Sequence, residues 1–161
     1  MTLVTKHPGA SACGICALIE RVASGQFADT VAELPHSWII LGDAQFYRGY
    51  CVMLAKRHVT ELHLFERADA LALFDELMAL GEAISNATNP LKLNYECLGN
   101  QQPHVHWHVF PRQAHDSRHL EPVWTRPESE RKVRLSDADR RSLVDALRGE
   151  LNRLLPGLRL R

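Results

Sequence analysis

The amino-acid sequence predicts an α+β fold: an antiparallel sheet of about five strands, a long helix inserted between strand pairs, and a second helix at the C-terminus. Short apolar or alternating runs, which are typical of strands, occur on both sides of residues 68–85. Within 68–85 the apolar residues instead recur every three or four positions, and a second stripe with this helical spacing lies within 136–155. We expect the 161 residues to form a single domain, 1–161.

Two short, strongly apolar runs predict the first strands. Residues 37–42 read SWIILG and end in a Gly-Asp turn, and residues 50–55 read YCVMLA and follow a glycine. Cys51 in the second run, and Cys97 further along the chain, lie within apolar, strand-like sequence. A reduced cysteine behaves as a small hydrophobic side chain, so we expect both thiols to be buried.

The period changes to that of a helix in residues 68–85. An Asn-Pro pair at 89–90 disfavours helical backbone beyond this region. Residues 91–98 then alternate apolar and polar side chains, and the turn GNQQP joins them to a further strand within 103–112. Two strands joined by so short a turn predict a β-hairpin, and hence antiparallel pairing. The apolar stripe of the helix consists of Leu73, Leu77, Leu80 and Ile84.

The C-terminal part divides into an irregular segment and a helix. Residues 113–135 are polar, contain prolines and follow no period, so we expect them to cover the functional site or to lie in a dimer contact. A helix is predicted over 136–155, where Ser136 and Asp139 resemble a capping box. The apolar stripe of this helix consists of Leu143, Leu147, Leu151 and Leu154.

The composition argues against several classes of protein. The 19 basic and 19 acidic residues balance, so the chain lacks the positive charge typical of nucleic-acid-binding proteins. No apolar run approaches the roughly 20 residues of a membrane-spanning helix, and the first residues do not resemble a secretory signal. We therefore expect a cytoplasmic protein without nucleic-acid or membrane partners. The four cysteines are then expected to be reduced and not paired in disulfides.

Three histidines occupy alternate positions in the stretch PHVHWHVFPR: His104, His106 and His108. Side chains alternate across a strand, so these imidazoles share one face while the apolar residues between them face the core. From the residues alone, three interpretations are open. The histidines could be solvent-exposed, they could bind a metal such as zinc, or one neutral imidazole could attack phosphorus while its neighbours bind phosphate.

The same stretch resembles the motif of the histidine triad (HIT) family, in which three histidines alternate with apolar residues. CGIC near the start, LAKRHVTEL at 54–62 and LNYECLGNQQPHVHWHVFPR at 93–112 are similar to bacterial members of that family. The resemblance covers most of the chain from Cys13 to about Pro127. It implies a HIT-like fold, a nucleotide or dinucleotide as substrate, no organic cofactor, and the homodimer that is usual in the family.

The resemblance also implies an activity. The protein would hydrolyse nucleotidyl conjugates at the α-phosphate, with dinucleoside polyphosphates and nucleoside phosphoramidates as candidate substrates. His106 would attack and form a covalent nucleotidyl-histidine, His108 would contact the phosphate or the leaving group, and His104 would anchor the strand. A nucleotidyltransferase is the nearest alternative, although that branch carries Gln at the third triad position. A catalytically weak nucleotide-binding regulatory module and a three-histidine metallohydrolase are the other candidates.

Further residues are implied as substrate ligands by the same resemblance. Asn100 and Gln101 in the turn, and Asn94 on the preceding strand, would support the phosphate, and Asp43 would hold the ribose. For each of these residues, ordinary turn chemistry is the competing explanation. Arg112 would help to neutralise phosphate, with a solvent-exposed arginine as the alternative.

Some family members bind a structural zinc ion, and the corresponding residues here are Cys13, Cys16, His58 and His104. In this comparison His58 would open the mid-chain helix. Two thiolates and two imidazoles suit closed, tetrahedral zinc, which stabilises a fold and performs no chemistry. We therefore expect a structural Zn²⁺ site, with a reduced, metal-free cysteine pair as the alternative.

Overall fold

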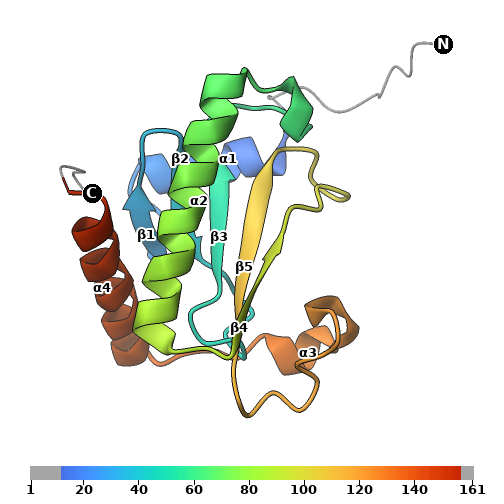
Figure 1. Cartoon of the computed structure of the whole chain (residues 1–161), viewed down its shortest axis with the longest axis vertical. Helices are drawn as coiled ribbons and strands as arrows, with labels where there is room; N and C mark the ends of the chain where they lie inside the picture. The colour runs from blue at the N-terminus through green and yellow to red at the C-terminus, as the bar shows by residue number, and fades with distance from the viewer. Residues whose placement is uncertain (1–11, 157–161) are drawn as a thin grey trace.

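The computed structural model describes residues 12–156 and has the predicted α+β architecture (Figure 1). Its elements are α1 (Gly14–Ala23), β1 (Thr30–Glu33), β2 (Ser37–Leu41), β3 (Cys51–Ala55), α2 (Arg67–Thr88), β4 (Lys92–Glu96), β5 (His106–Arg112), α3 (Glu128–Arg131) and α4 (Asp137–Leu154). Short 3-10 helices lie at Leu62–Leu64 and Val123–Thr125. The inserted helix and the C-terminal helix of the prediction are α2 and α4.

The five strands form one antiparallel sheet in the order β1-β2-β3-β5-β4. β4 and β5 are the predicted hairpin, and β3 lies in the centre between β2 and β5. In the register of the central pair, Val52 lies opposite His108 and Leu54 opposite His106. Since directly opposed residues point to the same side of a sheet, both imidazoles share a face with these apolar residues of β3.

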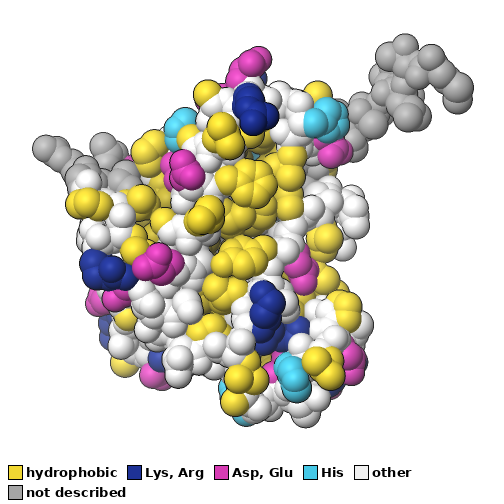
Figure 2. Space-filling model, viewed as in Figure 1, with side chains coloured by type: hydrophobic (Ala, Val, Ile, Leu, Met, Phe, Trp, Pro, Cys, Tyr) yellow, Lys and Arg dark blue, Asp and Glu magenta, His cyan; other side chains and the backbone are white. Residues whose placement is uncertain are grey.

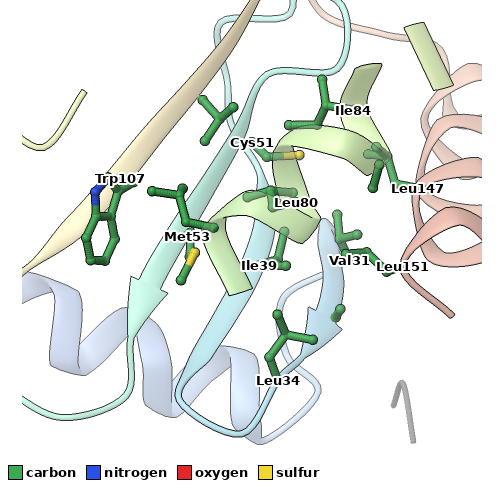
Figure 3. Packing of buried hydrophobic residues seen from close by; sticks show 14 of the residues in the cluster. Val31, Leu34, Ile39, Cys51, Met53, Leu80, Ile84, Trp107, Leu147 and Leu151 are labelled. Atoms are coloured by element: carbon green, nitrogen blue, oxygen red, sulfur yellow. The ribbon is translucent and has the colours of Figure 1, made fainter. Parts of the chain in front are cut away.

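The other face of the sheet carries the larger apolar core and is covered by α2 and α4 (Figure 1). Ile39, Met53 and Trp107 from three strands pack there with Leu80 of α2 and Leu147 of α4 (Figure 3). The predicted apolar stripe of α2 is buried along its whole length. Removal of this apolar surface from water is the main force that fixes both helices on the sheet.

The face with the imidazoles carries a second apolar cluster. α1 contributes Ile15 and Val22 to it, and the segment after β5 contributes Val123. The sheet contributes Ile40 and Phe110, among others. Two segments that are about 100 residues apart in the sequence thus flank the same face of the sheet.

The helix boundaries have local causes. α2 extends to Thr88, and Asn89 ends it in the left-handed conformation with φ 46°. At the start of α4 the backbone N–H of Asp139 donates to Ser136 Oγ at 3.1 Å, and that hydroxyl donates to the Asp139 carboxylate at 2.6 Å. Ser136 therefore caps the helix as one half of the predicted capping box, while the Asp139 carboxylate bonds to the Ser136 hydroxyl. Among residues 12–156, no helix has both the length and the apolar character needed to cross a membrane.

Two details differ from the expectations. Cys51 is fully buried, but Cys97 is exposed, because β4 ends at Glu96 and the thiol lies in the turn beyond it. The segment 113–135 is not irregular throughout, since it contains one 3-10 helix and α3.

Candidate functional site

A cavity of about 510 Å³ opens on the face of the sheet that carries the imidazoles. His106 and His108 form part of its wall, and Trp124 of the second 3-10 helix closes one side. The turn 98–102 forms another side. The remaining wall is apolar and comes from α1, β2 and β3, through Ile15, Leu18, Ile40, Val52 and Leu54. A mostly apolar cavity with a few convergent polar groups is the usual form of a small-molecule site.

His106 is held by its own strand. Its ring Nδ1 lies 2.6 Å from the carbonyl oxygen of His104. A carbonyl can only accept, so Nδ1 carries the proton of the neutral ring and donates it. Nε2 is then the unprotonated nitrogen. Among the residues that the structure describes it has no hydrogen-bond partner, and the residue lines the cavity. The side chain as a whole is only 7% exposed.

His108 is held by a residue that the sequence analysis did not single out. The hydroxyl of Tyr50 lies 2.6 Å from Nδ1 of His108. The ring of Tyr50 fits only because residue 42 is glycine, since a Cβ there would lie 1.9 Å from a ring carbon. Tyr50 is 3% exposed, and burial raises the pKa of its phenol.

The direction of this hydrogen bond sets the proton position on His108. The nitrogen of His108 is the only partner that the described part of the chain offers to the Tyr50 hydroxyl. A buried hydroxyl without an acceptor costs about 1–3 kcal/mol, so the hydroxyl donates and Nδ1 accepts. Burial, and to a lesser degree the neighbouring His106, lower the pKa of His108 to about 4. The neutral ring therefore carries its proton on Nε2, which is free to donate toward the cavity.

The turn after β4 supplies polar groups at the rim of the cavity. Asn100 and Gln101, both predicted substrate ligands, are exposed and line the cavity together with Gln102. The side-chain oxygen of Gln102 accepts a hydrogen bond from the backbone N–H of Gly14 at 3.1 Å. The turn is thereby tied to the first residue of α1.

Two other predicted substrate ligands have protein partners. The amide oxygen of Asn94 accepts from Arg112 Nη1 at 3.0 Å. The carboxylate of Asp43 is exposed and pairs with Lys132 Nζ at 2.9 Å. Neither residue lines the cavity. Their roles as phosphate and ribose ligands remain predictions.

Arg112 is neither exposed nor directed at the cavity, in contrast to both expectations for it. It is 2% exposed and its guanidinium bonds to the Asp116 carboxylate at 2.7 and 2.8 Å. It also donates to the carbonyls of Arg118 and Glu121. Burial alone would raise the pKa of Asp116, but hydrogen bonds from Arg112, the Arg118 backbone and Arg126 hold that pKa below its usual value. This network folds the segment after β5 back onto the sheet.

The folded segment brings Trp124 to the cavity. Its indole lies edge-on to His108, with ring centres 5.3 Å apart, and edge-on to Phe110 at 5.5 Å. The indole N–H donates to the carboxylate of Glu96 on β4. Trp124 is the residue of the segment 113–135 that lines the cavity.

Four predicted metal ligands come together beside the cavity: Cys13, Cys16, His58 and His104, whose ligand atoms all lie within 4.8 Å of one another. His58 lies in the loop after β3 and not at the start of α2, which begins only at Arg67. Its position in that loop still brings its imidazole to the cluster.

The geometry of this cluster fits a tetrahedral zinc ion. The two Nδ1 atoms of His58 and His104 are 3.2 Å apart. Sγ of Cys16 lies 3.4 and 3.5 Å from them, and Sγ of Cys13 lies 3.5 Å from Nδ1 of His104. Zn–N bonds of about 2.0–2.1 Å and Zn–S bonds of about 2.3 Å place tetrahedral ligands about 3.3–3.8 Å apart. Nε2 of His104 donates to the carbonyl of Ala55 at 2.7 Å, so its Nδ1 lone pair points at the cluster.

We predict that His106 and His108 are opposite neutral tautomers. A ¹⁵N NMR titration should find the proton of His106 on Nδ1 and that of His108 on Nε2. His108 should take up a second proton only as the pH falls to about 4, well below the value of about 6.5 that is usual for histidine. The His108→Gln variant assigns the signals. A proton on Nδ1 of His108, or its protonation above pH 6, would contradict the hydrogen-bond assignment.

Comparison with known proteins identifies the family. The model of the HIT domain family matches residues 25–115. Similar solved structures include histidine triad proteins from Bradyrhizobium japonicum (21% identity, TM-score 0.68, 81% of this chain and 94% of that chain) and Marinobacter aquaeolei (22%, 0.68, 84% and 95%). A Zn-bound histidine triad family protein from Mycobacterium smegmatis is also similar (21%, 0.63, 91% and 97%). No curated protein matches significantly. The chain, with its α+β fold and its alternating histidines, belongs to the HIT family.

Proposed function

We propose that this protein is a nucleotide-phosphate hydrolase that cleaves nucleotidyl conjugates at the α-phosphate through a covalent nucleotidyl-His106 intermediate. The observation that carries the proposal is the 2.6 Å contact between Nδ1 of His106 and the carbonyl of His104. It leaves the lone pair of Nε2 free at the wall of the cavity. A neutral imidazole with a fixed tautomer is a competent nucleophile near pH 7.

The reaction divides into two displacements. In the first, Nε2 of His106 forms a bond to the α-phosphorus, and the bond from phosphorus to the leaving group breaks. In the second, water attacks the same phosphorus, releases the imidazole and yields a nucleoside monophosphate. Two such steps replace one difficult attack by water. The wall of Ile40, Val52 and Leu54 would hold the nucleoside through apolar contact.

Hydrogen-bond donors at the cavity would stabilise the charge that spreads over the phosphoryl oxygens. Nε2–H of His108 is one donor, oriented by Tyr50. The amides of Asn100 and Gln101 at the rim are others. Donors fixed before the reaction stabilise a phosphoryl transition state without the cost of reorganising water.

We predict that His106→Ala abolishes release of nucleoside monophosphate from diadenosine polyphosphates and from adenosine 5′-phosphoramidate. The loss should be at least about a thousandfold, because no other group forms the covalent intermediate. The assay is run with EDTA present, since the proposed chemistry needs no added metal.

His63→Ala is the matched control, because it removes an exposed histidine outside this cavity, and it should keep full activity. His106→Gln retains a side chain of similar size in case the smaller residue disturbs folding. Turnover by either His106 variant at the wild-type rate would refute the proposal. A wild type that binds nucleotide without turnover would favour a regulatory binding module instead.

We also propose that Cys13, Cys16, His58 and His104 hold a structural Zn²⁺ ion. The donor set and its spacing fit closed tetrahedral coordination. When bound, zinc would supply a cross-link between α1, the loop after β3 and the start of the triad strand. The thiolates must be reduced for this role, which agrees with the cytoplasmic location that we propose.

Purified protein should contain about one zinc per chain by elemental analysis, and Cys16→Ser should lose it and unfold at a lower temperature. Cys97→Ser is the control, since it makes the same chemical change at an exposed cysteine outside the cluster. If wild type and Cys16→Ser contain equally little zinc after expression with added zinc, and melt at the same temperature, the cysteine pair is metal-free.

A homodimer is the third part of the proposal. Apolar side chains gather on the face seen in Figure 2, over α2 and the strands beside it. Phe74 and Met78 on α2 are 44% and 70% exposed, and Tyr95 on β4 is 46% exposed. β4 is also an edge strand with unpaired backbone groups. An apolar patch beside a free edge supports two-fold association of this face with itself.

Met78→Glu should convert a dimer into a monomer in sedimentation equilibrium, because it places a charge in the centre of the patch. Val133→Glu is the control, since Val133 is 43% exposed and lies between α3 and α4, outside the patch. A monomeric wild type at all concentrations, or a dimer unaffected by Met78→Glu, would exclude this interface.

A further inference from the structure

Arg131, at the end of α3, carries a charge that the fold leaves free. Its guanidinium lies 4.8 Å above the ring centre of Trp124, and its Nε donates to the carbonyl of Arg126 at 2.9 Å. Among residues 12–156, neither terminal nitrogen of this guanidinium has a hydrogen-bond acceptor. Stacking and the single bond through Nε fix the group in place while two N–H edges remain open.

The carboxylates around Arg131 have other partners. Lys132 pairs with both Asp43 and Glu128. Glu130 pairs with Arg126 at 2.9 Å, and Glu96 accepts from the indole of Trp124. The guanidinium of Arg131 is therefore available to an anion that comes from solution.

The position of Arg131 relates this free charge to the reaction centre. The indole that it covers is in edge contact with His108, so no more than one aromatic ring separates the guanidinium from the triad. The positive charge of Arg131 also acts on Tyr50, where it opposes the rise of the phenol pKa that burial causes. Arg131 does not itself line the cavity, but it stacks on Trp124, which forms the wall beside His108.

We propose that Arg131 and Trp124 form a subsite for an anionic leaving group, namely the phosphate chain beyond the α-phosphate. This inference rests on the proposed function and adds the class of leaving group to it. A guanidinium with two open N–H edges binds phosphate in a bidentate manner. The indole of Trp124, which contacts both Arg131 and His108, would place the guanidinium next to the phosphates beyond the α-phosphate.

The chemistry balances for such a leaving group. As Nε2 of His106 bonds to the α-phosphorus, the bond from that phosphorus to the bridging oxygen breaks, and its electron pair stays on the oxygen. The departing nucleoside polyphosphate gains one negative charge, which Arg131 stabilises. The nitrogen of a phosphoramidate takes a proton from the solvent as the P–N bond breaks and departs as neutral ammonia, so it gains nothing from this residue.

The test compares two substrates that share the adenosine α-phosphate and differ only in the leaving group: diadenosine tetraphosphate and adenosine 5′-phosphoramidate. Arg131→Gln should lower kcat/KM for the tetraphosphate on the order of tenfold and leave the phosphoramidate within about twofold. Arg131→Lys should recover most of the tetraphosphate activity, because it keeps the charge. Arg141→Gln, which removes an exposed charge on α4, should change neither substrate.

Each other outcome overturns the subsite. An equal fall for both substrates, with Arg131→Lys as poor as Arg131→Gln, would assign Arg131 only a structural role. No fall for either would mean that the charge is not used. A wild type that cleaves the phosphoramidate through His106 but not the tetraphosphate would overturn the subsite and retain the proposed hydrolase. Cleavage of neither substrate would overturn both.

Discussion

The backbone carbonyl of His104 is the constraint on which the rest of the site depends. It accepts a hydrogen bond from Nδ1–H of His106, with an N–O distance of 2.6 Å. This bond determines that the other ring nitrogen, Nε2, faces the cavity. The ring of the same residue donates to Ala55 on β3 and turns its other nitrogen toward the cysteine and histidine cluster. His104 thus contacts β3 through Nε2, the candidate metal site through Nδ1 and the candidate nucleophile through its carbonyl. β5 begins at His106, so His104 lies just before the strand, and each of the three imidazoles has a different partner.

The two imidazoles at the cavity differ because their partners differ. His106 is next to an acceptor, which keeps its proton on Nδ1, and His108 is next to a donor, which keeps its proton on Nε2. The first presents a lone pair and the second an N–H, which are the two functions that a phosphoryl displacement requires. Burial disfavours a charged ring at His108 and lowers the pKa of that residue. The segment after β5 completes the arrangement, as the buried pair of Arg112 and Asp116 brings Trp124 against His108.

Much of this could be predicted from the sequence, because local period determines which face a side chain takes. The alternation of His104, His106 and His108 and the stripe of α2 needed no tertiary information. The sequence analysis does not predict α1, although Ile15, Leu18 and Val22 recur at helical spacing. β1 has only four residues, which is too short for a period to be recognised.

The contacts that were not predicted depend on the three-dimensional pairing of distant residues. In the sequence, Tyr50 is only the first residue of an apolar, strand-like run. Its contact with His108 depends on the pairing of β3 with β5 and on the space that Gly42 leaves for the ring. The sequence predicts that Arg112 neutralises phosphate, but in the fold its guanidinium forms an ion pair with the buried carboxylate of Asp116. Zinc ligands could be inferred by resemblance, yet only the fold brings His58 to the cluster from a loop.

Rapid-quench mass spectrometry of the wild type during turnover is the direct test of the proposed nucleotidyl-histidine. The protein should gain the mass of one nucleotidyl group, peptide mapping should place it on His106, and it should decay at the rate of product release. Steady turnover with no adduct at any time, or with an adduct on another residue, would exclude His106 as the nucleophile.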